Sequence, residues 1–342
     1  MEIIMNVMNN DSIKTADGIM MAAQLASALE VSGTPKPGNV HRNADFMDTR
    51  FEHYLAGSIA IGPHIRDVAL MGMDAGRGLI KLNEIGIGKH IKRAIHEVRI
   101  WHKGGNTHLG ITLLFIPLAA SAGFMITKFG KIEPIGLRST LIKIMKATTY
   151  QDALDVLDAI LNSKASALGQ LDTAIAPDIM DIDVKNKIME QKISLYDLMK
   201  ISSKWDNVAK ELTTGMRISF GLGYKTLLDV YEKTNDINIA TVHTFLTILA
   251  KHPDTLIARK LGLKLTQNIN EAVKIGLIEA KKISKQAEII LRFGGLTSEK
   301  GKKALDRFDK KLRDPKNKLN PGTTADIVAS SLMIAIICGM KI

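Results

Sequence analysis

The chain has 342 residues, and 46% of them are hydrophobic, so it can bury a full core as one large domain or two ordinary ones. Its single cysteine, Cys338, excludes a disulfide within the chain, and a reducing, cytoplasmic setting is expected. The net charge is +11, but aromatic residues make up only 5% and do not interleave with the basic ones, which argues against a nucleic-acid stacking platform. The first residues lack a basic signal-peptide region, and the longest apolar run, 327–340, is too short for a membrane span. We therefore expect neither nucleic-acid nor membrane partners.

Helical periodicity recurs along most of the chain, and strand alternation does not. Residues 16–31 are predicted to form a helix that ends before two prolines, and a polar loop at 39–48 precedes a helix from Thr49 to about residue 71. The pattern weakens at 163–194, which is predicted to be an irregular connector or insertion. Further helical patterns cover residues 91–98, 108–124, 195–212, 225–232, 239–251, 268–293 and 298–312.

The last predicted helix, at 324–339, is apolar on nearly all sides. A helix of this kind belongs in the centre of a helical bundle, where every face is covered. The sequence thus predicts an all-α protein, with residues 1–342 forming a single multi-helix domain around a buried C-terminal helix.

Three short polar motifs interrupt this helical pattern: residues 35–39 (PKPGN), 104–110 (GGNTHLG) and 320–326 (NPGTTAD). The last two lead directly into strongly apolar helices. A helix N-terminus presents free backbone N–H groups and a partial positive charge, and both favour phosphate. Two such termini, with basic residues nearby, predict a polyphosphate or nucleotide ligand.

The first motif and the loop after it combine basic, amide and acidic side chains. Asp45 and Asp48 are three residues apart, and two carboxylates at that spacing can hold Mg²⁺ together with water and phosphate oxygens. Lys36 and Asn39 lie close by in the sequence and can contact phosphate. The alternative is a solvated turn in which Asp48 or Thr49 caps the following helix.

The second motif has two interpretations of similar weight. Asn106 and Thr107 can cap the helix that follows, or the same N–H groups can hold a phosphate. In the functional interpretation, Lys103 and His108 add charge or a proton donor. A lone histidine in such a place is more often structural than catalytic.

The third motif also fits a capping box, in which Asp326 stands in for the usual glutamate and only satisfies backbone donors. As a phosphate site it would use Asn320, Gly322 and Thr324. Asp254 opens another helix and is either an N-cap or a metal-binding carboxylate. Two further cations accompany these motifs: Arg259 follows Asp254 by five residues, and Arg217 lies among glycines.

These motifs together resemble the triphosphoribosyl-dephospho-CoA synthase family. Residues 30–38 match the family's Glu-Val…Pro-Lys-Pro-Gly stretch, and 41–48 match its acidic, His-containing loop more loosely. Its Asn-Thr-His-x-Gly run corresponds to 106–110. Its Asp-Thr…Arg…Gly run corresponds to 254–262, and its Pro-Gly-x-x-Ala-Asp end corresponds to 321–326.

The order and rough spacing of the motifs hold over residues 16–337, and this family-like region also differs from the family pattern in three places. Arg217-Ile218-Ser219 stands where the family has Arg-Gly-Glu. Leu109 stands where a lysine is usual, and the family's His-x-Asp-Met loop reads ADFMD at 44–48. The pattern is that of a divergent member.

The resemblance implies an all-α enzyme that joins the ribosyl C1 of ATP to the 2′-hydroxyl of 3′-dephospho-CoA and releases adenine. It implies Mg²⁺ on the triphosphate, carboxylates that stabilise an oxocarbenium-like ribose, and a base for the acceptor hydroxyl. The residues expected in catalysis are Asp45, Asp48, Asp254 and His108, and those expected to bind metal are Asp48, Asp254 and Asp326. The residues expected to bind nucleotide or phosphate are Lys36, Asn39, Lys103, Asn106, Thr107, Arg217, Arg259, Asn320, Gly322 and Thr324.

Two alternatives remain open. The same pentosyl transfer could use a different donor or acceptor. The donor could be phosphoribosyl pyrophosphate, and the acceptor a polyol hydroxyl of a methanopterin-type one-carbon coenzyme. The chain could also be a non-catalytic nucleotide-binding helical protein, and a homodimer is a possible state of either. If the chain is a transferase, its three motifs are predicted to meet in one cleft.

Overall fold

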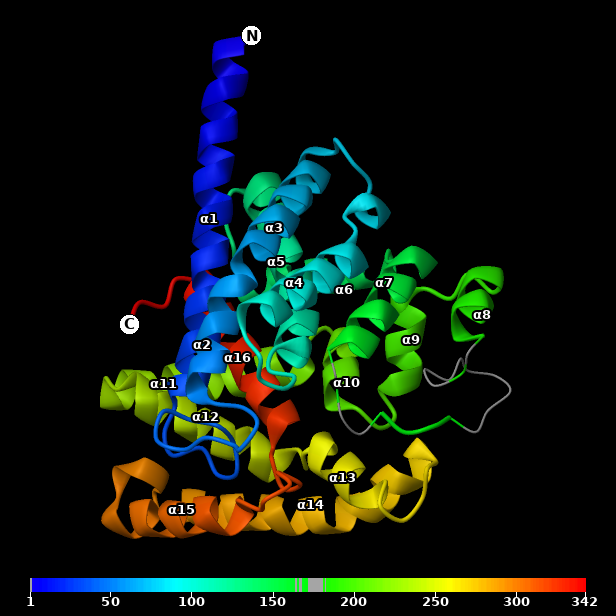
Figure 1. Cartoon of the computed structure of the whole chain (residues 1–342). Coiled ribbons are helices and arrows are strands. Elements are labelled where there is room, and N and C mark those ends of the chain that lie inside the picture. Colours follow the sequence, from blue (N-terminus) through cyan, green and yellow to red (C-terminus); the bar gives the residue numbers. More distant parts are fainter. Residues whose placement is uncertain (1, 164, 166–167, 172–180, 182) are drawn as a thin grey trace.

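The computed structural model describes residues 2–163, 165, 168–171, 181 and 183–342 (Figure 1). The described residues are mostly helical and contain no β-strand, only isolated bridges that join His41 to Ala44 and Gln170 to Asn268. The predicted all-α class is confirmed. The helices described are α1 (Glu2–Ser32), α2 (Phe51–Ala60), α3 (Gly62–Arg77), α4 (Ile87–Trp101), α5 (Leu109–Phe129), α6 (Pro134–Lys146), α7 (Tyr150–Asn162), α8 (Val184–Glu190), α9 (Leu195–Ser202), α10 (Asn207–Thr214), α11 (Tyr224–Thr234), α12 (Ile237–Lys251), α13 (Thr255–Gly262), α14 (Ile269–Arg292), α15 (Glu299–Leu312) and α16 (Gly322–Ile337).

Helix α16 runs through the middle of the molecule and packs against α1, α5 and α12 (Figure 1). Nearly all of its side chains are buried, as expected from its apolar sequence. Its buried residues join those of α1, α5 and α12 in one continuous hydrophobic cluster. The helix that leads out of the third motif is therefore a rigid central element.

Helix α5, which leads out of the second motif, is the other central element. By length and composition it could cross a membrane, yet 78% of its most apolar window is buried inside the protein. It packs closely along α3, where glycines let the two backbones approach: a Cβ at Gly72 would lie 2.0 Å from the Ala120 carbonyl oxygen. Its burial is that of a core helix.

The helix predicted to run from Thr49 to about residue 71 is instead two helices, α2 and α3, that meet at Ile61. Pro63 lies in the first turn of α3, where a backbone N–H would have no partner within the helix in any case. In the interior of one continuous helix the same proline would break the hydrogen-bond pattern. Gly62 allows a close contact, because a Cβ there would lie 2.2 Å from the Gln24 side-chain nitrogen.

The predicted irregular segment at 163–194 is only partly within the described residues. Its final part contains a short helix, α8, so the prediction is wrong there. Residues 164, 166–167, 172–180 and 182 lie outside the described residues. Residues 168–171 are held against the start of α14, where the Gln170 N–H donates to the Gln267 carbonyl at 2.8 Å.

Candidate active site

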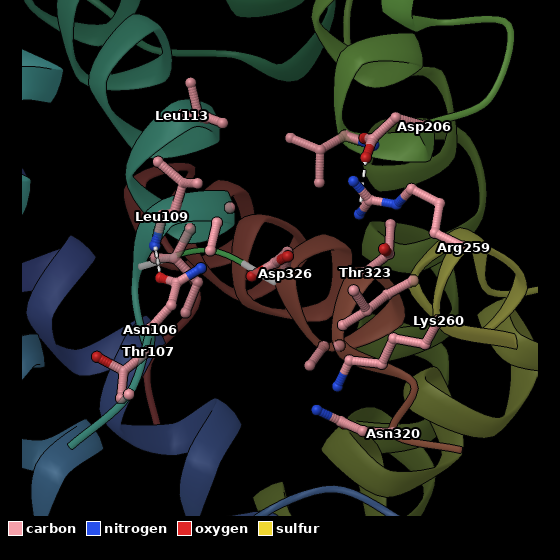
Figure 2. Close-up of a pocket in the computed structure, with 18 of the residues that line it drawn as sticks. Asn106, Thr107, Leu109, Leu113, Asp206, Arg259, Lys260, Asn320, Thr323 and Asp326 are labelled. Carbon is pink, nitrogen blue, oxygen red and sulfur yellow. Dashed lines mark hydrogen bonds and ion pairs between the residues drawn. The ribbon is translucent and has the colours of Figure 1, made fainter. Parts of the chain in front are cut away.

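A cavity of about 320 Å³ opens where the N-terminal ends of α5, α13 and α16 converge with the loop at 33–50 (Figure 2). Residues of all three motifs line it, although they are far apart in the sequence: Asn39, Asp48, Gly105, Asn106, Thr107, Gly110, Asn320, Gly322, Thr323 and Asp326. The predicted meeting of the three motifs is thus seen in the structure.

A buried network holds the first motif in place. The Gly38 N–H donates to Asp309 Oδ1 at 2.9 Å, and Arg313 donates to the Asn39 carbonyl at 2.7 Å. Arg313 also pairs with Asp309 at 3.0 Å. The Asn39 side-chain amide donates to Asn320 Oδ1 at 3.0 Å, so the first and third motifs are joined directly at the cavity wall.

The sequence had suggested that Lys36 contacts phosphate. In the structure Lys36 does not line the cavity but lies behind its wall. It is fully buried and forms an ion pair with Glu30, which does line the cavity. Burial raises the pKa of Glu30 and lowers that of Lys36, and the attraction between the two charges opposes both shifts. Lys36 therefore neutralises a cavity carboxylate from behind, where its ammonium is already engaged.

The second motif supplies the start of α5. The Asn106 side chain accepts a hydrogen bond from the Leu109 N–H at 3.2 Å, so the predicted capping role is present (Figure 2). The next two N–H groups, of Gly110 and Ile111, have no partner among the described residues, and both residues line the cavity. These are the free donors that a helix N-terminus offers to an anion.

The orientation of the Thr107 hydroxyl follows from its neighbours. The Gly104 N–H donates to His102 Nδ1 at 3.1 Å, so Nε2 of His102 carries the proton and donates to Thr107 Oγ1 at 3.0 Å. The Thr107 hydroxyl then donates to His108 Nδ1 at 2.7 Å. Thr107 thus presents its remaining lone pair to the cavity as a hydrogen-bond acceptor.

His108 is fully buried and does not line the cavity. Its Nε2–H donates to Ser27 Oγ at 3.1 Å, and this chain of hydrogen bonds continues through Ser58 to the Tyr54 carbonyl. Burial lowers the pKa of His108 to about 3, so the ring is neutral at physiological pH. Since the chain ends at a backbone carbonyl, His108 is placed to orient Thr107, not to donate a proton to a ligand.

Asp254 and Thr324 are both engaged in fastening α13 to α16. Asp254 Oδ1 accepts from the Leu256 and Ile257 N–H groups at 2.9 and 3.1 Å and so caps α13. Its Oδ2 accepts from the N–H and hydroxyl of Thr324 at 2.7 and 2.8 Å. Asp254 is buried and lines no part of the cavity. The N-cap interpretation thus describes its position, and neither residue faces the cavity.

Asp326 lies at the centre of the cavity (Figure 2). Its carboxyl group has no hydrogen-bond or ion-pair partner among the described residues, so the predicted capping box is absent. Burial, followed by the nearby charges of Glu30 and Asp254, raises its pKa well above the ordinary value. Gly110 packs against it, since a Cβ there would lie 2.0 Å from Asp326 Oδ2. This is the position where the site needs glycine.

Helix α13 brings two cations to the opposite wall (Figure 2). Arg259 pairs with Asp206 at 3.0 Å, and its buried Nε has no partner within the described part of the chain. Lys260 donates to the Asn317 carbonyl at 2.8 Å, and burial lowers its pKa. An unpaired buried guanidinium N–H indicates a place for an anionic ligand.

Besides Lys36, His108, Asp254 and Thr324, three more predicted residues lie away from the cavity lining. Asp45 is exposed and caps α2 by accepting from the Phe51 N–H at 2.8 Å, a role that the sequence had suggested for Asp48 or Thr49. Lys103 and Arg217 are exposed, and neither lines the cavity.

Sequence reasoning missed several residues that the cavity gathers. Asp206 precedes α10 as an ordinary N-cap would, and only its ion pair with Arg259 identifies it as a residue of the cavity. Glu30 is matched to the family pattern, but its position at the cavity could not be read from a helical run of apolar residues. Trp205 gave no signal at all, because a single buried tryptophan is usually core.

No group of three or more potential metal ligands of the His, Cys, Asp or Glu type occurs within the described ranges. The predicted set of Asp48, Asp254 and Asp326 is therefore not assembled as a metal cluster. Of the three, Asp48 and Asp326 line the cavity.

An all-α fold whose cavity combines free helix N-termini, half-buried cations and carboxylates has the groups that a polyanionic ligand and its cation require. Residues 16–341 match the model of the ATP:dephospho-CoA triphosphoribosyl transferase family, and the chain belongs to that family.

A curated relative and a solved structure support this membership. The chain is 23% identical over 323 residues to the 2-(5''-triphosphoribosyl)-3'-dephosphocoenzyme-A synthase of Klebsiella pneumoniae, covering 92% of this chain and 89% of the relative. It is also similar to an Archaeoglobus fulgidus protein whose crystal structure is described as that of a candidate triphosphoribosyl-dephospho-CoA synthase. That match has a TM-score of 0.56 and 26% identity, covering 84% of this chain and all of the other.

Proposed function

We propose that this chain transfers the triphosphoribosyl group of ATP to the 2′-hydroxyl of 3′-dephospho-CoA and releases adenine. The observation that carries the proposal is the cavity itself, where the family's motifs converge on one polyanion-binding surface. The C1–N bond of the donor breaks with its electron pair going to adenine, and the acceptor oxygen forms the new bond to C1. The hydroxyl proton of the acceptor is lost and adenine gains one, so the reaction is balanced.

The triphosphate is assigned to the wall formed by α13 and to the starts of α5 and α16. Arg259 and Lys260 supply the cations. The backbone N–H of Thr323 is without a partner in the described part of the chain, as are those of Gly110 and Ile111. Charge-assisted hydrogen bonds from these groups would hold phosphate oxygens far more strongly than neutral contacts would.

The charges of the cavity explain why the triphosphate needs a companion cation. Glu30 is matched by Lys36, and Asp206 is matched by Arg259. Asp48 and Asp326 have no ion-pair partner among the described residues, and Lys260 is the one lining cation left to offset them. A free triphosphate would be repelled by these two carboxylates. The residues present fit Mg²⁺ that arrives on the nucleotide, because such an ion keeps several waters and takes only one or two protein carboxylates. Asp48 and Asp326 would hold it, and the bound ion would neutralise phosphate charge.

The carboxylates also suit the ribose. Breaking the C1–N bond develops positive charge on the sugar, and fixed negative groups in a partly desolvated cavity stabilise that charge. Asp326 is the best placed, since its oxygens are free and it lies at the centre of the cavity. Thr107, held as an acceptor by His102 and His108, is placed to receive a hydrogen bond from a ribose or acceptor hydroxyl.

A test is to incubate the protein with Mg²⁺ and measure free adenine and free pyrophosphate by chromatography. The reactions would combine ATP, whose leaving group is adenine, or phosphoribosyl pyrophosphate, whose leaving group is pyrophosphate, with dephospho-CoA present or absent. The proposal predicts adenine release from ATP, at a rate that rises with dephospho-CoA, and no pyrophosphate release from phosphoribosyl pyrophosphate. Release that ignores the acceptor would indicate a nucleosidase. Turnover with phosphoribosyl pyrophosphate would indicate the other donor, and ATP binding without turnover would indicate a binding protein.

A further inference from the structure

A smaller apolar compartment of about 70 Å³ adjoins the main cavity, between α7, α9 and the start of α14. The two share Ile160, Leu168, Met199, Ser202 and Trp205 as lining residues. One water molecule needs only about 10–15 Å³ of such space, so the compartment is larger than a hydration site. Its position beside the main cavity makes it a candidate subsite for part of a substrate.

The compartment has no charged lining among the described residues. The side chains that are not shared are all aliphatic: Val156, Leu157, Leu171, Leu198, Ile201 and Ile269, with Gly169. Phosphate cannot enter such a chamber without losing its hydration and its cations. The occupant must be the uncharged part of a substrate.

Two polar groups in the compartment are without partners. Trp205 is only 8% exposed, yet its indole N–H has no hydrogen bond to any described residue. The Ser202 hydroxyl also lacks a partner among them, although the Ser202 carbonyl accepts from the Trp205 and Asp206 N–H groups at 3.1 and 2.9 Å. Trp205 Nε1 is not one of the fully buried side-chain atoms that lack a partner, so this unpaired N–H has exposed surface and is accessible to a ligand.

The position of Trp205 is coupled to the phosphate wall. It lies in the turn between α9 and α10, next to Asp206, which pairs with Arg259 at 3.0 Å. Asp206 also caps α10 by accepting from the Val208 N–H at 2.7 Å. The turn that carries the aromatic ring is thus joined to the guanidinium on α13 by the ion pair between Asp206 and Arg259.

We propose that this compartment is the subsite for the adenine base of the donor, a deduction that rests on the proposed function. A purine is flat, uncharged and rich in ring-nitrogen acceptors, which match an apolar chamber offering an indole N–H and a hydroxyl. The pantetheine arm of the acceptor carries two amides, and their donors and acceptors would outnumber the partners available there. The acceptor also carries an adenine, but the Asp206–Arg259 ion pair joins this compartment to the wall assigned to the triphosphate, which favours the base of the donor. With adenine in the compartment, the ribose lies in the main cavity and the triphosphate extends toward Arg259 and Lys260.

The chain offers a direct probe, because it has only two tryptophans. Trp101 is 63% exposed, bonds to Glu97, and lines neither chamber. In the Trp101→Phe variant, all tryptophan fluorescence comes from Trp205. Titration with adenine should change that fluorescence saturably, and pantetheine should not. Because dephospho-CoA also carries an adenine, the inhibition pattern assigns the base: adenine should inhibit competitively against ATP and not against dephospho-CoA, and the opposite pattern would assign the compartment to the acceptor.

The Trp205→Phe variant keeps an aromatic ring and removes the N–H. It should weaken inhibition by adenine about tenfold, the usual effect of one lost hydrogen bond, and leave the KM for dephospho-CoA unchanged. Trp101→Phe should change neither value and serves as the matched control.

Each outcome separates the subsite from the proposed function. If pantetheine changes the fluorescence of Trp205, or Trp205→Phe raises the KM for dephospho-CoA alone, the compartment belongs to the acceptor and the subsite proposal is wrong. If neither adenine nor pantetheine changes the fluorescence of Trp205 while transfer proceeds, the subsite proposal is again wrong and the proposed function stands. If adenine changes the fluorescence but no transfer occurs, the compartment binds adenine, and the proposed transfer, with the donor role of the compartment, is wrong.

Discussion

Asp326 lies at the centre of the cavity, and its carboxyl group has no partner among the residues that the structure describes. Burial raises its pKa well above the ordinary value of 3.8, so between these two values the folded state binds more protons than the unfolded chain does. The stability of the ligand-free protein therefore falls as pH rises through that window.

Asp326→Asn removes this penalty, and we expect it to raise the melting temperature at pH 8 by about 1–2 °C. The same variant should lose transfer activity. Thermal melts at pH 8 and pH 4 provide the check, because the gain should shrink at the lower pH. A variant that is destabilised at pH 8 would show that Asp326 is a structural group.

Asp48 and Asp45 form a natural matched pair on one loop. Asp48 lines the cavity, whereas Asp45 accepts a hydrogen bond from the Phe51 N–H at the start of α2. Asp48→Asn should reduce kcat/KM at least about a hundredfold with little change in melting temperature. Asp45→Ala should cost about 1 kcal/mol of stability and leave activity per folded molecule intact. The reverse pattern, measured by kinetics and melts, would exchange their roles.

Arg259 presents a planar fork of which one buried N–H is unused, and lysine cannot reproduce that geometry. Arg259→Lys should weaken ATP·Mg²⁺ binding by about 1–3 kcal/mol, the range for charge-assisted hydrogen bonds. Titration calorimetry measures this directly. Unchanged affinity would remove Arg259 from the nucleotide site.

At the scale of elements, Asp254 decides how α13 meets α16. The family resemblance had implied a catalytic and metal-binding role for Asp254. The structure leads us to a different expectation, because four donors converge on this buried carboxylate.

Asp254→Ala should lower the free energy of unfolding by about 2–4 kcal/mol, since it leaves buried donors unpaired at two helix starts. Urea denaturation would measure the loss, with Asp45→Ala as the reference for a single exposed cap. A change below about 1 kcal/mol would mean that the two helices are fastened elsewhere.

Helix starts are also what the sequence predicted best. The transitions at 104–110 and 320–326 combine glycine or proline with capping side chains, and these local signals suffice to place α5 and α16. The second partner of Asp254 was out of reach, because Thr324 lies 70 residues away. The complete burial of Lys36 was equally unpredictable, since lysine is rarely buried and its partner Glu30 lies in an apolar helix.

At the scale of the whole molecule, the family-like order of the motifs predicted that they would meet, and they do. The apolar compartment beside Trp205 could not be predicted, because aliphatic positions on α7, α9 and α14 read only as core. A pattern of hydrophobic residues indicates which faces are buried but not whether their packing leaves a chamber.

The central claim is that this cavity moves an intact triphosphoribosyl group to a hydroxyl of the acceptor. Mass spectrometry of dephospho-CoA after incubation with ATP carrying ¹³C in its ribose tests that claim most directly. The account predicts an acceptor that has gained a triphosphate and one fully labelled ribose, in equal amount to the adenine released, and no such product from Asp48→Asn. Labelled ribose triphosphate free in solution, or an acceptor of unchanged mass, would contradict it.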